Sequence, residues 1–508
     1  MKTVNIIGAG IAGLSAGCYL QMNGYKTRIF ESHNAPGGLC TSWKRADYTF
    51  DGCIHWLVGA NPKSKFHRLW SELINMDNIT FHHHAEYMRV YDAEGKHIAL
   101  YTDVDKLEKE LLEKATDDVD FIIPLIKSIR KISRFEMDPS KATELMHFWD
   151  GITMGMKMLP YLSHFRKWNK RTRDIAAELK TPLLKKTIMN TFDPDMAFIF
   201  MVFTLAWMNK KDAAYPLGGS LMFSKEIEKR YRELGGEIFY RYPVEKIIAT
   251  KINSHNRATG IVTDKGEEYV ADITISAADG HDTIFRMLEG RFIDEQIEAY
   301  YKDYLPFPSY LQISFGLGKK FEGIPQNQMI PLKNPIKLDP ETEIHDLPLR
   351  FLNYDPNLAP EGKSVLSMML TTRNDQYWSR LRKREHKKYI AEKKRIASRI
   401  IEGMEAHFEG IGKHIEETDI STPATVIRYT NNWKGSFEGW VLTPEIGFKS
   451  MKKTLPGLDN FYMIGQWVEP GGGLPTVLRS GRNVAQIICK KDKKKFKTLQ
   501  AKTATPAV

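Results

Sequence analysis

Residues 4–43 read VNIIGAGIAGLSAGCYLQMNGYKTRIFESHNAPGGLCTSW, and this stretch decides the fold. Val4 to Ile7 is a short apolar run typical of a buried parallel strand. Gly8, Gly10 and Gly13 follow it in GxGxxG spacing, ahead of a segment whose small side chains are typical of a closely packed helix. A strand, a glycine-rich turn and a helix in this order predict a site for the pyrophosphate of a dinucleotide.

Each glycine of the turn has its own expected task. Gly8 permits the tight turn, Gly10 lets the backbone approach the pyrophosphate, and Gly13 lets the helix lie close to the strand. The helix then starts with Ile11 and Ala12. Its free amides and positive dipole face the phosphates, and we therefore predict that these five residues bind the cofactor.

The second strand is expected at Lys26 to Phe30, and Glu31 stands at its end. A carboxylate there accepts hydrogen bonds from both ribose hydroxyls and disfavours a 2′-phosphate. The motif alone is compatible with NAD or FAD. The Pro-Gly-Gly segment that follows favours FAD, because it extends the binding loop along the cofactor instead of returning at once to a third strand. The predicted loop contributes Ser32, Gly37, Gly38 and Leu39.

Further segments resemble a known family. After GAGIAGLSAG, FES and PGGLCTSW come YTFDGCIHWLVG, then YPLGGSLMFSKEIEKRYRELGGEIFYRYPVEKI at 215–247 and ITISAADGHDTI at 273–284. The series ends with TPATVIRYTNNWKGSFEGW at 422–440 and NFYMIGQWVEPGGGLPTVLRSGRNVAQII at 460–488. In this order the segments resemble the flavoprotein superfamily of phytoene desaturases, carotenoid isomerases and retinol saturases, with FAD amine oxidases as more distant members. Gly52 and Cys53 depart from the pattern, which has a small polar residue and a glycine there.

The resemblance implies an α/β fold in which a Rossmann-like FAD-binding domain is interleaved with an α+β substrate domain. It also implies that the backbone of Val244 meets the adenine and that Ala277, after the buried strand 273–276, lies at the nucleotide. Toward the end of the chain, Pro475 suits the first turn of a helix through Ile488. Its positive end is expected beside the flavin's pyrimidine edge. The residues assigned to FAD in this part are Gly465, Gln466, Gly473, Leu474 and Pro475.

The scattered motifs predict two interleaved domains. Residues 1–100, 215–290 and 420–495 form the discontinuous FAD-binding domain. Residues 101–214, a helix-rich insertion, and 291–419 form the substrate domain, and 496–508 form a flexible tail. A helix at Lys225–Leu234 and a tight hairpin around Lys265 and Gly266 are expected within the second cofactor segment.

Composition excludes several classes of protein. Of 508 residues, 42% are hydrophobic and 27% charged, as in an ordinary globular protein. Four cysteines, Cys18, Cys40, Cys53 and Cys489, show no metal-ligand spacing and favour a reducing compartment. The N-terminus enters a strand without the regions of a signal peptide, so a cytoplasmic protein is expected. The run His82–His84 is interpreted as a strand and turn, and no metal site is predicted.

The charge of the chain raises the question of nucleic acid. Its net charge is +11, but the excess lies in 380–395 and 490–497, which lack the glycine-aromatic pattern of an RNA-binding sheet. No nucleic-acid partner is predicted.

Two segments indicate contact with apolar molecules. The uncharged run Met196–Met208 is thirteen residues long, too short for a bilayer core that needs about 20 residues; it is interpreted as a buried helix, as the wall of an apolar tunnel, or as both. Residues 154–173 mix apolar, aromatic and basic side chains as an interfacial helix does. Peripheral contact with the inner face of a membrane is one interpretation, and a plain solvated face is the other.

These observations lead to an FAD-dependent oxidoreductase that desaturates or saturates C–C or C=C bonds of a long isoprenoid or lipid. NAD(P)H is considered as the electron donor. His55 is the candidate for proton transfer, since a histidine pKa lies near neutrality, against the alternative of a packing residue. Trp56 and Trp467 line the cavity or fill the core. The alternatives are a flavin-dependent polyene cis-trans isomerase, an FAD amine oxidase, and a non-enzymatic prenyl-lipid-binding escort.

Overall fold

The structure is a computed structural model that describes residues 1–136, 138–447, 449–469 and 471–501. The predicted tail therefore lies partly outside the described residues, at 502–508. Its first part is attached to the body of the protein. Lys497 donates its amide to Asn23 Oδ1 at 2.8 Å, and Ala501 donates its amide to the Ser71 carbonyl at 2.9 Å.

A parallel five-stranded sheet has the order β10-β2-β1-β14-β21 and carries the predicted turn. It unites segments that are far apart in the sequence. The strands are β1 (Thr3–Ile7), β2 (Lys26–Glu31), β10 (Glu237–Tyr240), β14 (Ile273–Ser276) and β21 (Phe461–Met463). The predicted strands at 4–7, 26–30 and 273–276 are confirmed. Four of the five residues of β1 and all four of β14 are buried, as continuous apolar runs in parallel sheets are.

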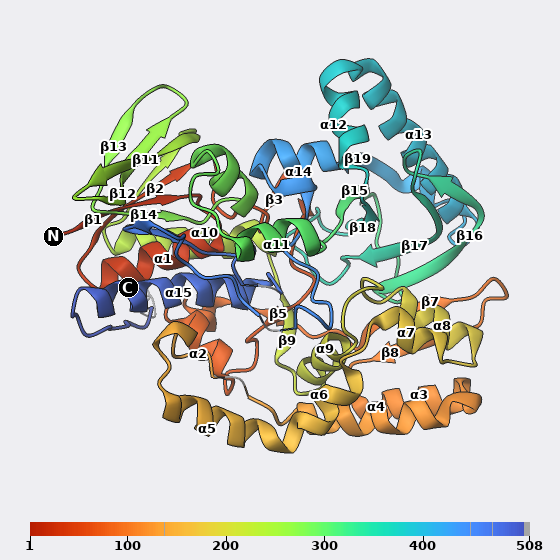
Figure 1. Ribbon diagram of the computed structural model, residues 1–508. Coiled ribbons are helices and arrows are strands. Elements are labelled where there is room, and N and C mark those ends of the chain that lie inside the picture. Colours follow the sequence, from red (N-terminus) through yellow and green to blue (C-terminus); the bar gives the residue numbers. More distant parts are fainter. Residues whose placement is uncertain (137, 448, 470, 502–508) are drawn as a thin grey trace, which may run out of the picture.

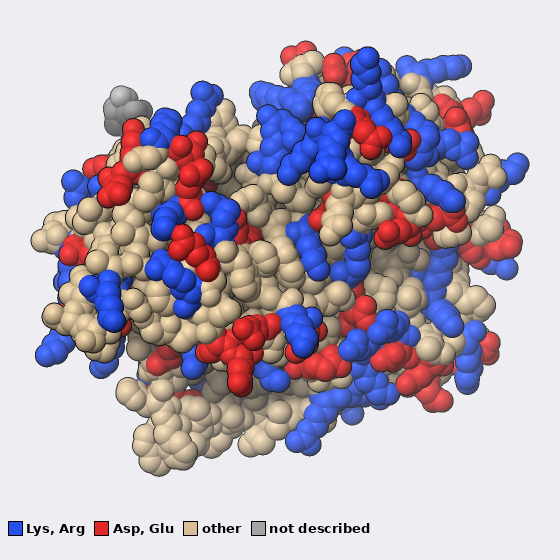
Figure 2. Space-filling model, turned by 45° about the horizontal axis from the view of Figure 1, so that its top comes forward, with Lys and Arg blue, Asp and Glu red and all other residues tan. Residues whose placement is uncertain are grey.

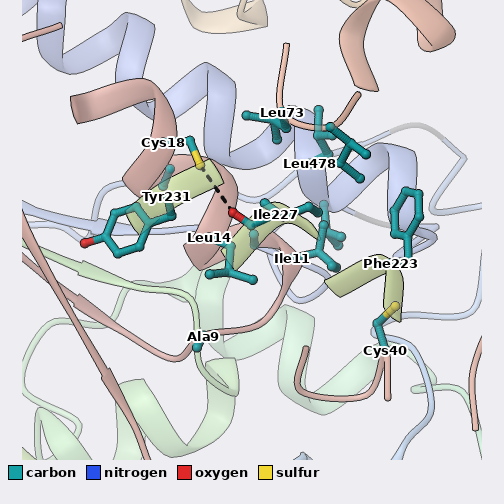
Figure 3. Close-up of a cluster of buried hydrophobic side chains, with 14 of the residues drawn as sticks. Ala9, Ile11, Leu14, Cys18, Cys40, Leu73, Phe223, Ile227, Tyr231 and Leu478 are labelled. Carbon is teal, nitrogen blue, oxygen red and sulfur yellow. Dashed lines mark hydrogen bonds between the residues drawn. The ribbon is translucent and has the colours of Figure 1, made fainter. Parts of the chain in front are cut away.

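Three helices cover one face of this sheet (Figure 1). They are α1 (Ile11–Met22), α10 (Gly219–Glu233) and α15 (Leu474–Lys491). Figure 3 shows the core between them, where the Cys18 thiol lies 3.9 Å from the Ile227 carbonyl oxygen. Cys18 is fully buried, in agreement with the packing role expected for it.

A second, smaller sheet covers the opposite face (Figure 1). It consists of β11 (Val244–Ile252), β12 (His255–Thr263), β13 (Glu268–Val270) and β20 (Leu458–Asp459). The hairpin predicted around Lys265 and Gly266 is confirmed, since Val262 pairs with Glu268. The helix predicted at Lys225–Leu234 starts earlier, because Gly218, with φ +98°, ends the preceding strand and serves as N-cap.

The other half of the molecule is built on a seven-stranded sheet of order β19-β15-β18-β17-β16-β7-β8. Its strands are β7 (Glu86–Tyr91), β8 (His97–Tyr101), β15 (Ser309–Leu317), β16 (Asn327–Lys337), β17 (Glu343–Phe351), β18 (Ser364–Thr372) and β19 (Ile415–Ser421). Strands β7 and β8 thus pair with this sheet although they lie in the first predicted cofactor segment. Figure 1 places α12 (Asp375–Arg384), α13 (His386–Glu405) and α14 (Pro423–Thr430) beside it. The predicted fold class is confirmed, while the domain boundaries stay a prediction.

The insertion forms a separate helical layer (Figure 1). Its helices are α3 (Val104–Lys114), α4 (Val119–Ile132), α5 (Phe148–Met158), α6 (Leu162–Trp168), α7 (Thr172–Ala177), α8 (Pro182–Met189) and α9 (Ile199–Asn209). The predicted helix at 196–208 corresponds to α9, and most of its side chains are buried. Among the described residues, no helix combines the length and the apolarity needed to cross a bilayer.

Residues 154–173 do not form one continuous helix, and their contact with a membrane stays a prediction. The segment is divided among α5, a short 3₁₀ turn at Leu159–Tyr161, α6 and the first residues of α7. Pro160 stands at the break, where its ring and missing N–H stop a regular helix. Trp168, one of the aromatic residues that suggested the interface, is buried and donates its indole N–H to Ser128 Oγ at 2.7 Å.

Short elements connect the two halves. A hairpin of β3 (Ser42–Arg45) and β4 (Tyr48–Asp51) leads into the segment that carries His55. A three-stranded sheet then joins β5 (Leu57–Val58), β9 (Ala213–Pro216) and β6 (Phe81–His82). The remaining α-helices are α2 (Lys65–Ser71) and α11 (Glu295–Asp303).

Candidate active site

The glycine turn has the geometry that the motif predicts. Gly8 has φ +96°, a conformation that side-chain-bearing residues rarely adopt. A Cβ on Gly13 would lie 2.0 Å from the Gly8 carbonyl oxygen, so only glycine lets α1 begin this close to the strand. Gly10 is the N-cap of α1 and leaves the first turn without a side-chain cap. The first amides of α1 are thus available to an anion.

The loop after β2 closes over this turn. Gly37 and Gly38 have φ values of +110° and +61°. The Gly37 amide donates to the Ala9 carbonyl at 2.8 Å. A Cβ on Gly10 would meet only the Gly37 carbonyl oxygen, at 3.9 Å. The turn at Gly8 and Gly10 and the loop at Gly37 and Gly38 therefore face each other through their main chains, without side chains between them.

Glu31 closes the turn from the end of β2. Its buried carboxylate accepts the Ala9 amide at 2.7 Å through Oε2, and the His33 amide at 2.8 Å through Oε1. Ser32 donates its hydroxyl to the same Oε1 at 3.2 Å. From the described part of the chain, Oε2 accepts only the Ala9 amide and has a second lone pair. Glu31 can therefore accept a ligand hydroxyl while it holds the turn.

The start of α15 faces the same space. Gly473 is its N-cap without a side-chain hydrogen bond, and Pro475 occupies its first turn, as predicted. Gly465, with φ +101°, donates its amide to Ser480 Oγ at 3.1 Å. A second set of free helix amides thus faces the cavity some distance from those of α1.

A single cavity with a volume of about 2120 Å³ runs between the halves of the molecule. One end is the glycine cradle, and the other is bounded by the helical insertion and the seven-stranded sheet. Apolar and aromatic side chains from the insertion line it, among them Phe135, Phe165, Met189, Phe192, Phe200, Phe203 and Met208. Five residues of α9 line the cavity, and most side chains of this helix are buried. The helix is therefore both part of the core and part of the cavity wall.

The predicted cofactor residues converge on the cavity with one exception. Gly13 does not line it, because this glycine lies behind the turn against Gly8. The residues that do line it are Gly8, Gly10, Ile11, Ala12, Glu31, Ser32, Gly37, Gly38, Leu39, Val244, Ala277, Gly465, Gln466, Gly473, Leu474 and Pro475. Their contacts with a cofactor stay a prediction.

His55 lines the cavity, but its ionisation differs from the expectation. Burial, with the Arg350 guanidinium and His84 nearby, lowers the pKa of His55 to about 3. This lowered pKa opposes titration of the imidazole near neutral pH, while the side chain itself is exposed to the open cavity. Arg350 also donates to the Ile54 carbonyl at 2.9 Å, and so fixes the main chain beside His55. The catalytic role of His55 stays a prediction, now for a neutral imidazole.

Two acidic residues that the sequence analysis missed line the cavity. Burial raises the pKa of Glu438 to about 7. A Cβ on Gly472 would lie 2.9 Å from Cβ of Gln466 and 3.5 Å from Cβ of Glu438, so this carboxyl lies close to the start of α15. Burial also raises the pKa of Asp279 to about 7, although the Asp282 and Trp433 amides donate to it at 2.7 and 2.8 Å. Glu438 lies within the segment 422–440 that carries the resemblance, but the sequence alone does not show that this side chain lines the cavity.

The other candidates pack against neighbouring side chains. Trp467 is 1% exposed and packs edge-on against Trp440, whereas Trp56 is partly open and packs against Tyr87. Both touch the cavity. His82 and His84 each contact Gln326 Oε1 at 3.0 Å. Within the described residues, no cluster of His, Cys, Asp or Glu has the arrangement of a metal site.

Comparison with known proteins bears on the whole chain. Residues 6–73 match the NAD(P)-binding Rossmann-like domain. The chain is 25% identical to the chloroplastic prolycopene isomerase of Arabidopsis thaliana, over 94% of this chain and 80% of that protein. It is 23% identical to the neurosporene-forming phytoene desaturase of Rhodobacter capsulatus, over 95% and 93%. The predicted resemblance is confirmed. A third relative, the inactive all-trans-retinol 13,14-reductase of Danio rerio, is 21% identical over 73% and 62%.

The fold has solved counterparts. Cyclohexylamine oxidase from Brevibacterium oxydans has a TM-score of 0.57 at 14% identity, covering 97% of this chain and all of that one. The prediction of an FAD-dependent oxidoreductase is confirmed at the level of the relatives and the fold. The cofactor prediction is confirmed for a dinucleotide site of the Rossmann type.

Proposed function

We propose that the protein is an FAD-dependent oxidoreductase that changes the C–C or C=C bonds of a long apolar isoprenoid or related lipid. The observation that carries the proposal is the continuity of the cavity, which joins the glycine cradle to a chamber lined by Phe and Met. Its volume of about 2120 Å³ exceeds the roughly 300–1,000 Å³ of a pocket for a drug-sized ligand. There is room for a dinucleotide and an extended substrate end to end.

The residues of the cradle fit FAD. Gly10 lines the cavity with main chain alone, and the amides of α1 and α15 supply two sites for negative charge. Glu31, which accepts the Ala9 amide, would accept ribose hydroxyls and would repel the 2′-phosphate of NADP. When bound, FAD supplies hydride acceptance or donation at N5.

The chain itself aligns the substrate and excludes water. The aromatic and Met side chains of the chamber recognise an apolar chain by shape and area, because they offer few hydrogen-bonding groups. The insertion helices roof this chamber, so that the reacting carbons are kept away from solvent.

Glu438 is better suited than His55 to hold a proton in this chamber. A carboxyl with a pKa of about 7 is protonated in a large fraction of molecules at neutral pH. It can release that proton when a C=C double bond is reduced. It can accept a proton when a C=C double bond is formed. The neutral imidazole of His55 can orient groups by hydrogen bonds but is a weak base.

A second candidate function is cis-trans isomerisation of a polyene. It is favoured by relatives that are themselves prolycopene isomerases, including the one from Arabidopsis thaliana. The same cavity serves both reactions. An amine oxidase is supported by likeness of fold alone, and an escort without cofactor is disfavoured by the complete glycine cradle and Glu31.

The test uses purified protein, FAD and phytoene, prolycopene or retinol in lipid vesicles, with and without NAD(P)H under anaerobic conditions. A saturase is expected to consume NAD(P)H and a desaturase to require an acceptor such as a quinone. An isomerase changes geometry without net loss or gain of hydrogen, as resolved by chromatography and mass spectrometry. A protein that binds no FAD but retains prenyl lipid would support the escort and contradict the proposal.

We further propose that the protein works at the cytoplasmic face of a membrane.

A further inference from the structure

Helix α5 exposes an unusual amount of apolar surface. The side chains of Phe148, Trp149, Met156 and Leu159 are 77%, 74%, 59% and 62% exposed, and no residue of α5 is buried. Ile152 and Met154 are also exposed. At the lower-left edge of the molecule, where α5 lies in Figure 1, Figure 2 shows a largely uncharged surface.

The polarity of α5 is opposite to that of an ordinary surface helix. At about 100° per residue, Trp149, Ile152, Met156 and Leu159 share one stripe. Asp150, Thr153, Met154 and Lys157, on the other side, line the cavity. A helix on a water-soluble surface normally directs its apolar stripe to the core. Here the stripe that carries Asp and Lys faces inward, and the apolar stripe faces outward.

Charges around the helix suit a negatively charged surface. Residues 148–173 contain six Lys or Arg side chains and one Asp. Arg166 and Lys167, on α6 after the turn at Pro160, are exposed. Trp and Phe at one end of an apolar stripe with basic residues beside it form the pattern of a helix that lies in the interface of a bilayer.

We propose that α5 is a docking helix whose outer stripe, Trp149, Ile152, Met156 and Leu159, enters the surface of a bilayer that contains anionic phospholipid. A second copy of the chain is a poorer occupant. Eleven residues at about 1.5 Å each give a stripe about 17 Å long and about 10 Å wide, far below the roughly 800 Å² per partner of a stable interface. Insertion in a bilayer needs no matching surface.

The inner stripe makes α5 a roof over the cavity at the same time. A lipid that leaves the bilayer beside α5 can reach the Phe-lined chamber without crossing water. This route rests on the proposed function, whereas the docking itself does not.

The experiment measures co-sedimentation of the full FAD-loaded protein with vesicles of phosphatidylcholine, with and without phosphatidylglycerol. We expect wild type to bind the anionic vesicles, and Trp149→Ser/Met156→Ser to bind at least about tenfold more weakly. Arg166→Glu/Lys167→Glu should lose about fivefold or more on anionic vesicles only. The matched control is Val270→Ser, on β13, where an equally exposed side chain (70%) lies on another part of the surface; its binding should not change.

Each outcome decides the matter. Equal vesicle binding by wild type and the Trp149 and Met156 variant would overturn the proposal. So would failure of that variant to fold or to hold FAD, because it would show that the stripe is packed against protein. A wild-type dimer in light scattering that becomes a monomer in the variant, without vesicle binding, would replace the bilayer by a second copy. Turnover of detergent-dispersed polyene should be equal in both proteins, so a protein that docks but has no turnover would disprove the proposed function alone.

Discussion

Gly481 of α15 lies against the main chain of α1 at Ala12, so closely that a Cβ at position 481 would stand 2.5 Å from the Ala12 carbonyl oxygen. Ser15 of α1 donates its hydroxyl to the Leu478 carbonyl of α15 at 2.8 Å in the same contact. Two helices from opposite ends of the chain are thereby held together with both N-termini facing the cavity. The two anion-binding ends of the cradle are positioned by this contact.

Gly481→Val should therefore weaken both the fold and the cofactor site. Overpacking against main chain costs about 1–3 kcal/mol or more, and it should lower the melting temperature and release FAD. Gly151→Ala is the control, because no atom lies within 4 Å of a Cβ there; replacing this helical glycine should leave stability equal or slightly higher. Full FAD content and an unchanged melting temperature in Gly481→Val would show that the contact is unimportant.

Glu31→Gln should lower affinity for FAD. The variant loses the charge that holds the Ala9 amide and faces the ribose, which is worth about 1–3 kcal/mol, or roughly five- to 150-fold in Kd. Fluorescence titration of the cofactor-free protein measures this. Glu237→Gln, on the neighbouring strand β10 with a half-exposed side chain, should bind FAD as wild type does. Equal Kd values for the Glu31 variant and wild type would remove Glu31 from the site.

Glu438 should make stability and activity pH-dependent near neutrality. Its pKa is raised from 4.5 to about 7 in the folded protein. The folded state therefore holds a proton that the unfolded state has lost, and the free energy of unfolding contributed by this group falls as pH rises from about 4.5 to about 7. Urea unfolding of Glu438→Gln should show a smaller fall than wild type over this range. The pKa of Asp279 is raised as well. The Glu438→Gln variant should therefore keep part of the pH dependence of the free energy of unfolding.

The turnover rate should depend on the protonation of Glu438. If Glu438 donates a proton to the substrate, wild-type turnover declines as pH rises through about 7, and Glu438→Gln loses this inflection together with most of its rate. A wild-type inflection that survives in Glu438→Gln would exclude the residue.

His55→Ala should abolish turnover while FAD stays bound, if the imidazole positions the substrate. Because the pKa of His55 is lowered to about 3, no inflection between about pH 5 and about pH 8 belongs to it. His55→Asn, which keeps hydrogen-bonding capacity, should retain more activity than His55→Ala, and its pH profile should match wild type. Turnover of His55→Ala equal to wild type would remove the residue from the mechanism.

Sequence predicted the parts of the site that depend on local backbone geometry. Gly8, Gly10, Gly37 and Gly473 could be placed because glycine is required where a turn has positive φ or a ligand meets main chain. Strand β14 (ITIS) is fully buried although Thr274 and Ser276 are polar, and it could be placed through the resemblance and its β-branched residues.

The rest depends on contacts between distant segments. The pKa of His55 is lowered first by burial and then by Arg350, which lies almost three hundred residues away along the chain. Glu438 lies near Gly472 and in electrostatic range of Cys53, and both residues are distant from it along the chain. Likewise, α5 contains apolar residues on both of its sides, and only the position of the cavity shows which side faces outward. A pattern in the sequence carries none of this information.

The central claim is tested most directly by anaerobic mixing of the FAD-loaded protein with a long polyene in vesicles, while the flavin absorbance and the product are followed together. The account predicts conversion of the polyene, by a change in its number of double bonds or in their geometry, that requires FAD and is lost with Phe200→Asp/Phe203→Asp in the apolar chamber although flavin is retained. Binding and conversion that are indifferent to charges placed in this chamber, or oxidation of small amines in place of polyenes, would contradict it.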